Sequence, residues 1–174
     1  MERARAGDRP AFAALYERYA STVHGVLLAR VPPEEARDLV QEVFLVALRA
    51  LDTLADAGRV GAWLCAIARN KVRDHYKGRR PALELGEVSE PADPGAGVAS
   101  PDEGEEARAV LSLLRELPEA YRETLAMRLV EDLTGPEIAL RTGMTQGSVR
   151  VNLHRGMKLL RERLERLGWR GALS

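Results

Sequence analysis

The stretch TGPEIALRTGMTQGSVRVNLHRGMKLL, residues 134–160, has the pattern of two helices joined by a tight turn. Thr134 and Glu137 have the spacing of a capping box, in which hydroxyl and carboxylate each bind a free backbone amide at a helix start, and Pro136 suits the first turn. Gly143 can adopt the left-handed conformation that ends a helix, and Thr145 can cap the next one. The stretch therefore predicts a helix-turn-helix.

The second of these helices has an apolar and a polar side. Apolar residues recur at helical spacing and predict the buried side, which consists of Val149, Leu153, Met157 and Leu160. The polar side carries guanidinium, amide and ammonium donors that suit a DNA major groove, from Arg150, Asn152, Arg155 and Lys158. Two helices joined by a glycine turn also occur in small helical domains of other kinds, so this spacing alone leaves that alternative open.

Composition favours an all-α protein. Of the 174 residues, 45% are hydrophobic, 30% charged and only 5% aromatic, and strand-favouring residues are sparse. Cys65 is the single cysteine, which excludes an internal disulfide and a thiolate zinc cluster; we expect an inert core thiol there rather than a redox switch. The longest apolar run, Val43 to Leu48, is too short to span a membrane, so we expect a cytoplasmic protein without membrane insertion.

The formal net charge of zero conceals a segregation of charge along the chain. Residues 1–80 sum to +4, residues 81–107 to −8 and residues 108–174 to +4. The acidic segment is also rich in proline and glycine and lacks a sustained apolar period, which is typical of a linker. We therefore predict two helical bundles, residues 1–80 and 106–174, joined by an acidic flexible linker over residues 81–105.

Three amphipathic helices are expected before the linker. The first has a buried side of Phe12, Leu15, Tyr16, Tyr19, Val23, Val26 and Leu27, and the second one of Ala36, Val40, Val43, Phe44, Ala47, Leu48 and Leu51. A third runs from about residue 61 into a basic segment near residue 77, with Trp63, Leu64, Ile67, Ala68 and Val72 inward. After the linker, a helix ending at Pro118 and another around Leu125 precede the helix-turn-helix.

Two faces of the N-terminal helices are candidate binding surfaces. On the second helix, one face carries Asp38, Gln41, Glu42 and Leu45. Periodicity alone predicts that this face is solvated, but an apolar residue among charged ones suggests a protein partner. On the third, the side opposite the buried stripe is mostly cationic, with Arg69, Asn70, Arg73, Asp74, Lys77 and Arg80. Such a face attracts phosphate, and duplex DNA, single-stranded DNA or RNA would fit it.

The residues do not suggest an enzyme. His24, His75 and His154 fall on three different helices without metal-ligand spacing, no serine has the setting of a nucleophile turn, and no glycine-rich phosphate loop follows a strand. We therefore expect no catalytic residue, no metal and no cofactor.

Taken in order, these segments resemble the extracytoplasmic-function (ECF) sigma factors, small two-domain subunits of bacterial RNA polymerase. FAALYERYASTVHGVLLARV, ARDLVQEVFLVALRAL and AWLCAIARNKVRDHYKGRR are similar to successive parts of the promoter-melting domain. LLRELPEAYRETLAMRLVEDLTGPEIALRTGMTQGSVRVNLHRGMKLLRERL is similar to the domain that reads the −35 element. The resemblance covers nearly the whole chain.

The resemblance implies partners and residue roles. It makes Asp38, Gln41, Glu42 and Leu45 the face that binds the clamp helices of the polymerase β′ subunit, with the β flap as a second contact on the core enzyme. It makes the cationic face of the third helix, with the loop Asp52 to Gly61, the reader of the −10 element, which would be captured as unstacked single strand. The −35 element would be contacted by Gln146, Ser148, Arg150, Val151, Asn152, Arg155 and Lys158. An anti-sigma factor is a further implied partner.

The chain departs from the family pattern at three places. Val60-Gly61 stands where the family often has Phe-Arg, and Cys65 where a large residue is common. Val151 and Asn152 replace a common Ser and Arg, which should shift −35 preference toward a thymine methyl and an adenine. Two alternatives remain at this stage: a dimeric helix-turn-helix regulator that binds operators alone, and a protein-interaction module with merely solvated basic faces.

Overall fold

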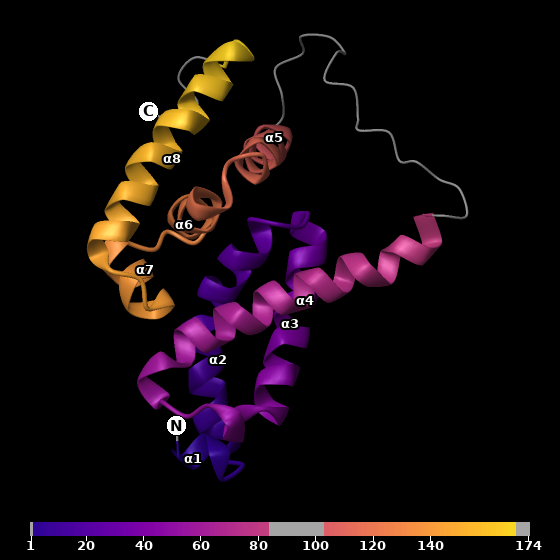
Figure 1. The fold of residues 1–174 in the computed structure, drawn as a ribbon, viewed down its shortest axis with the longest axis vertical. Coiled ribbons are helices and arrows are strands. Elements are labelled where there is room, and N and C mark those ends of the chain that lie inside the picture. The colour runs from indigo at the N-terminus through magenta and orange to yellow at the C-terminus, as the bar shows by residue number, and fades with distance from the viewer. Residues whose placement is uncertain (1, 84–102, 170–174) are drawn as a thin grey trace.

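The structure, a computed structural model, describes residues 2–83 and 103–169 and is helical throughout these ranges, without a strand (Figure 1). The first range holds α1 (Glu2–Arg5), α2 (Arg9–Leu28), α3 (Pro33–Arg49), the 3₁₀ turns η1 (Leu51–Thr53) and η2 (Ala57–Arg59), and α4 (Val60–Leu83). The second range holds α5 (Glu103–Arg115), α6 (Glu119–Leu129), α7 (Gly135–Thr142) and α8 (Gln146–Arg166). The all-α prediction is confirmed.

The helices extend somewhat into the predicted linker. α4 continues to Leu83 and α5 already begins at Glu103, whereas the linker was expected over residues 81–105. The middle of the predicted linker, residues 84–102, lies outside the described residues. The extent of the linker and its flexibility therefore stay predictions.

In the N-terminal bundle, α2, α3 and α4 pack around a common apolar core. Asp8 caps α2 by accepting a hydrogen bond from the amide of Ala11 at 3.1 Å, and the buried stripes of all three helices face inward. Two residues that were predicted to be buried are exposed instead: Tyr16 is 39% exposed and Leu48 is 47% exposed. Both lie at the edge of their stripe, with Tyr16 leaning on the ring of Phe44 at a centroid distance of 4.6 Å.

In the C-terminal bundle, α6 and α8 cross at close range. Gly156 of α8 is buried against α6, and a Cβ added to it would lie 2.8 Å from the Leu125 side chain and 3.0 Å from the Cβ of Tyr121. α7 packs on both helices and completes the helix-turn-helix. The absence of a side chain at position 156 therefore sets the spacing of this bundle.

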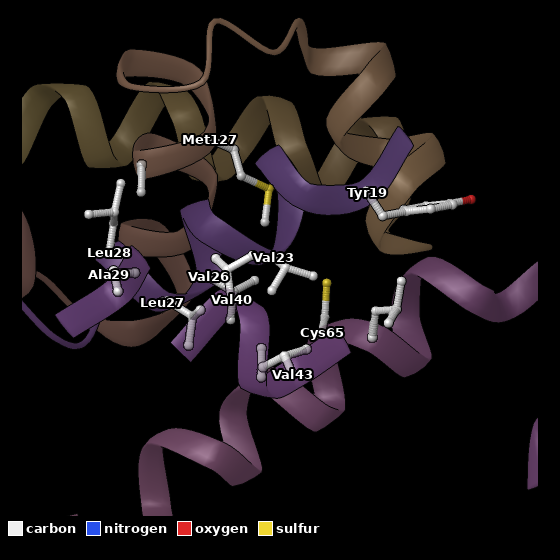
Figure 2. Packing of buried hydrophobic residues seen from close by; sticks show 14 of the residues in the cluster. Tyr19, Val23, Val26, Leu27, Leu28, Ala29, Val40, Val43, Cys65 and Met127 are labelled. Atoms are coloured by element: carbon white, nitrogen blue, oxygen red, sulfur yellow. The ribbon is translucent and has the colours of Figure 1, made fainter. Parts of the chain in front are cut away.

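The two bundles pack on one another and share a continuous core, with α6 and α7 resting on α2 and α4 (Figure 1). Met127 of α6 is fully buried and points toward Val23 and Val26 of α2 (Figure 2). Opposite it, a Cβ on Gly25 would lie 2.7 Å from Cγ of Met127. The helical pattern predicts two bundles, but it does not predict this contact between them.

Candidate nucleic-acid interface

The helix-turn-helix has the caps that the sequence predicts. Thr134 accepts a hydrogen bond from the amide of Glu137 at 3.4 Å, and the Glu137 carboxylate accepts one from the amide of Thr134 at 2.8 Å, which completes the capping box. The Thr134 hydroxyl also donates to the Glu137 carboxylate at 2.7 Å, and this bond, together with the one from the Thr134 amide, holds the pKa of the Glu137 carboxyl below its usual range. Gly143 ends α7 with φ of 76°, and Thr145 caps α8 by accepting from the amide of Ser148 at 3.1 Å.

The outward side of α8 carries the residues predicted to contact the −35 element. Gln146, Ser148, Arg150, Val151, Arg155 and Lys158 are exposed, and Asn152 is half-buried. The Ser148 hydroxyl lies 2.8 Å from that of Thr145, so it already takes part in the cap. Beside them is a shallow hollow between the starts of α7 and α8, lined by Gly135, Pro136, Gln146, Gly147, Arg150 and Leu153. A helix start with free amides, a cation and an exposed amide side chain can bind phosphate and read base edges.

The outward side of α4 brings together most of the residues predicted for the −10 element. Asn70, Arg73, Asp74 and Lys77 are all exposed, and Arg73 Nη2 donates to Asn70 Oδ1 at 2.5 Å. The side chain of Arg80 lies outside the described residues. The exposed set combines cations with amide and carboxylate groups, which suits an unpaired strand.

Arg69 differs from its neighbours because it pairs with the C-terminal bundle. Its Nε and Nη2 donate to the two carboxylate oxygens of Glu123 in α6, at 2.9 and 2.8 Å. The Glu123 side chain is only 12% exposed and the Arg69 side chain 40%. Arg69 was predicted to contact DNA from its spacing on α4, and in this arrangement its donors are engaged by Glu123.

Glu123 also binds a second guanidinium, that of Arg30 in the turn that follows α2. Arg30 Nη1 lies 2.5 Å from Glu123 Oε1 and Nη2 lies 2.5 Å from Glu119 Oε1, and the Arg30 side chain is 9% exposed. Burial by itself would raise the pKa of the Glu123 carboxyl, but the hydrogen bonds from Arg69 and the charge of Arg30 outweigh it and hold that pKa below its usual range. The same bonds raise the pKa of Arg69. The three side chains form one ionic cluster across the two bundles, in which Glu123 and Arg30 are largely buried and Arg69 is partly exposed.

The first turn of α4 meets the end of α7 and the turn of the helix-turn-helix. Gly61 is buried, and a Cβ added to it would overlap the carbonyl oxygen of Arg141 at the end of α7. Arg141 also donates to the hydroxyl of Ser21 on α2 at 2.9 Å. Ala62 lies under Gly143, where an added Cβ would be 3.4 Å from that of Ala62. The departure at Val60-Gly61 thus has a structural consequence, because a glycine there lets the backbone of α7 approach closely.

The predicted protein-docking face on α3 is exposed as a unit. Asp38, Gln41 and Glu42 are exposed, and Leu45 is 54% exposed. Glu42 is held by Lys71 of α4, whose Nζ lies 2.9 Å from Glu42 Oε2. Lys71 was not among the residues predicted for this face. Leu48 was expected in the buried stripe, but it is exposed and follows Leu45 along the same face.

Cys65 lies in the core beside the ionic cluster. The residue is 1% exposed, and burial raises the pKa of its thiol to about 12. A thiol with so little thiolate is a poor nucleophile. Within residues 2–83 and 103–169, no three histidine, cysteine or acidic side chains are grouped as metal ligands. Nor does any helix of these two ranges have the length and apolarity to cross a membrane.

Each of the two bundles matches a known protein family. Residues 15–81 match the family "Sigma-70 region 2", and residues 107–160 match "Sigma-70, region 4". The RNA polymerase sigma factor CarQ of Myxococcus xanthus is 33% identical over 96% of this chain and 97% of its own length. The ECF RNA polymerase sigma factor BldN of Streptomyces coelicolor is 36% identical over 92% of this chain, which spans 62% of that relative.

Two solved structures have a similar fold. CnrH, solved in complex with the cytosolic domain of CnrY, superposes with a TM-score of 0.59 at 27% identity over 94% of each chain. The sigma factor RpoE from Bartonella quintana, solved with the anti-sigma factor NepR, gives a TM-score of 0.56 at 19% identity over 89% of this chain and 97% of its own. The chain therefore belongs to the ECF sigma factors, which direct bacterial RNA polymerase to promoters.

Proposed function

We propose that residues 1–80 dock on core polymerase and melt the −10 element, and that residues 106–174 read the −35 element. The observation that carries this proposal is the presence of two exposed cationic helix faces, on α4 and α8, in bundles that match sigma regions 2 and 4. One face combines cations with groups that can bind unstacked bases, and the other has the form of a major-groove reader. Two such faces on one chain suit a protein that reads two separated DNA elements.

The −10 face comprises Asn70, Arg73, Asp74 and Lys77, with Arg69 and Arg80 as further contacts. The −35 face comprises Gln146, Ser148, Arg150, Val151, Asn152, Arg155 and Lys158. No step of this function breaks a covalent bond, because binding energy from captured bases offsets the cost of opening the duplex. We therefore propose a non-catalytic subunit that acts in the bacterial cytoplasm, where promoter DNA lies.

The α3 face is proposed to bind the β′ clamp helices. Leu45 supplies an apolar contact amid Asp38, Gln41 and Glu42, and such a combination suits a partner helix that has both apolar and basic residues. The β flap is the proposed contact of the C-terminal bundle. A protein partner that holds the chain inactive, an anti-sigma factor, is also proposed, since CnrH was solved in complex with a domain of another protein.

Run-off transcription on a library of promoters, with purified core polymerase, tests the proposal. We expect specific transcripts only when core and this chain are both present. Tight operator binding by the chain alone would favour a dimeric regulator, and a lack of any specific transcript with an active core enzyme would exclude the sigma function for this chain.

Paired variants test the two proposed faces. Asp38→Ala with Glu42→Ala should weaken core binding with the helix content intact, whereas Glu165→Ala, an exposed charge at the far end of α8, should not. Arg150→Ala should weaken promoter use by about 1–3 kcal/mol if it binds a base edge. Arg161→Ala on the same helix is the matched control, and an equal loss on every −35 sequence would mark Arg150 as a phosphate contact instead.

A further inference from the structure

We propose that the short helix α1 braces the loop between α3 and α4, and that Arg5 is a positioning residue for recognition of the −10 element. The loop runs from Asp52 to Gly61 and includes the 3₁₀ turn η2. The brace stands on contacts within the N-terminal bundle, and its effect on promoter choice rests on the proposed role of this loop, beside α4, in binding the −10 strand.

The loop is anchored in the core at few points. Leu51, Leu54 and Val60 are buried, whereas the residues between them, 52–53 and 55–59, are exposed. A loop that buries so little apolar surface opens locally at a low cost in free energy unless other contacts hold it. The conformation of this loop therefore depends strongly on its hydrogen bonds.

The hydrogen bonds inside the loop are local. The Asp56 carboxylate accepts a bond from the amide of Gly58 at 2.8 Å, and the Asp56 carbonyl accepts one from the amide of Arg59 at 3.0 Å. The Thr53 hydroxyl donates to the carbonyl of Ala50 at 2.6 Å. Because each bond joins residues two or three positions apart, these bonds shape single turns and do not fix the loop to the bundle.

Arg5 supplies a bond of longer range. Its Nη2 donates to the carbonyl oxygen of Leu54, which lies 49 positions further along the chain. Leu54 follows η1 in an extended conformation, with ψ of 102°, and its amide donates to the carbonyl of Leu51 at 3.3 Å. With its side chain buried as well, Leu54 is held at three groups, at the point where the exposed residues 55–59 begin.

The helix that carries Arg5 is itself fixed to the bundle. Ala4 is buried, and α1 packs on both α2 and η1, beside the connection between α3 and α4 (Figure 1). Asp8 ties α1 to α2, because its carboxylate binds Arg3 Nε at 2.7 Å and also accepts from the amide of Ala11 at 3.1 Å. The guanidinium of Arg5 thus has a defined place from which to hold the loop.

A loop held in this way should discriminate better between bases. A loop that must become ordered on binding spends part of its binding free energy on that ordering, whereas a preformed loop does not. A loose loop can also adjust to an incorrect base. Arg5 acts through Leu54 rather than on DNA, so its loss should reduce discrimination at the −10 element without removing a phosphate contact.

Hydrogen exchange on the free full-length chain tests the brace without DNA or polymerase. Arg5→Met keeps the stem of the side chain and removes its donors, so the amides of residues 54–59 should exchange about threefold to tenfold faster, as expected for one lost hydrogen bond. Arg5→Lys keeps a donor and should restore the protection. Arg9→Met removes a cation from an exposed position at the start of α2, and it should leave the exchange unchanged.

The amides of residues 6–8, which bond to carbonyls of α1, report whether α1 stays folded. If they too exchange faster in Arg5→Met, the comparison of Arg5→Lys with Arg5→Met decides. Parent-like exchange of the loop in Arg5→Met would overturn the brace. So would an Arg5→Lys chain whose loop exchanges as fast as that of Arg5→Met.

Run-off transcription tests the effect on promoter choice, with a promoter that the parent chain selects from the library. The preference for the selected −10 element over its single-base variants should fall in Arg5→Met by a factor similar to that seen in exchange. Discrimination at the −35 element and binding to core polymerase should not change. A uniform loss on every −10 sequence, with a salt slope reduced by about one, would show that Arg5 contacts a phosphate and would overturn its positioning role.

The brace and the sigma function can fail separately. A lack of transcripts from the parent chain with active core would refute the sigma function, while hydrogen exchange would still decide whether Arg5 holds the loop. Transcription by the parent chain, together with unchanged −10 discrimination in Arg5→Met, would refute the role of the brace in promoter recognition and would leave the sigma function standing.

Discussion

Two glycines of α8 should respond to alanine with opposite signs. Alanine in place of glycine inside a helix gains roughly 0.5–1 kcal/mol because it restricts the unfolded chain. At Gly147 the added Cβ meets only the Thr145 hydroxyl, at 3.9 Å, so this gain should be realised in part. At Gly156 the same atom would press on Leu125 and on the Cβ of Tyr121.

The expected loss at Gly156 follows from that crowding. Leu125 is fully buried and Tyr121 is contacted at its Cβ, next to the backbone, so neither can move away easily. Overpacking of this kind costs about 1–3 kcal/mol. After the helix gain is subtracted, Gly156→Ala should destabilise the chain by about 1 kcal/mol. With a urea dependence of about 2 kcal/mol/M, the unfolding midpoint should fall by about 0.5 M.

Urea unfolding of the full-length chain without DNA, followed by far-ultraviolet circular dichroism, measures both changes. Gly147→Ala serves as the control for helix propensity. If Gly156→Ala raised the midpoint as Gly147→Ala does, α6 and α8 would not cross as closely as described, and the packing argument would be refuted.

Three further outcomes follow from the structure. Thr134→Ala should lower stability by about 1 kcal/mol through loss of the capping box, whereas Thr53→Ala, outside any α-helix, should have a smaller effect in the same urea assay. The Glu123 ion pairs should contribute their full stabilisation above the ordinary pKa of a glutamate and lose it as pH falls through the lowered pKa of that carboxyl, so the urea midpoint should fall in acid and not between pH 8 and 6; a fall between pH 8 and 6 would contradict this. Cys65 should react with iodoacetamide at pH 8.5 far more slowly in the folded chain than in urea, and equal rates would show that the thiol is not buried.

Features set by neighbouring residues could be predicted from the sequence. The capping box of Thr134 and Glu137 and the left-handed turn at Gly143 depend on residues three to nine positions apart, and all of them are confirmed. The buried stripes were mostly correct for the same reason. Tyr16 and Leu48 were misplaced because periodicity gives the centre of a stripe, whereas the elements packed beside it decide where the stripe ends.

The contacts between the bundles could not be predicted. Arg69 and Glu123 are 54 positions apart and lie on opposite sides of the predicted linker, so helical spacing says nothing of their distance. Arg69 was grouped with its cationic neighbours because it shares their side of α4. Gly61 could be recognised as a departure from the family pattern, but its role as a point of close approach depends on where α7 lies.

The packing of Met127 against α2 has a consequence for the behaviour of the protein at high concentration. When the bundles separate, Met127 and the apolar residues opposite it, Val23 and Val26, become exposed to water on two different surfaces of one molecule. These surfaces are complementary, so the α6 of one opened chain can pack on the α2 of a second. Variants in which the two bundles separate should therefore form swapped dimers. The amount of monomer recovered in purification should depend on how quickly a partner protein covers the exposed surfaces of α2 and α6.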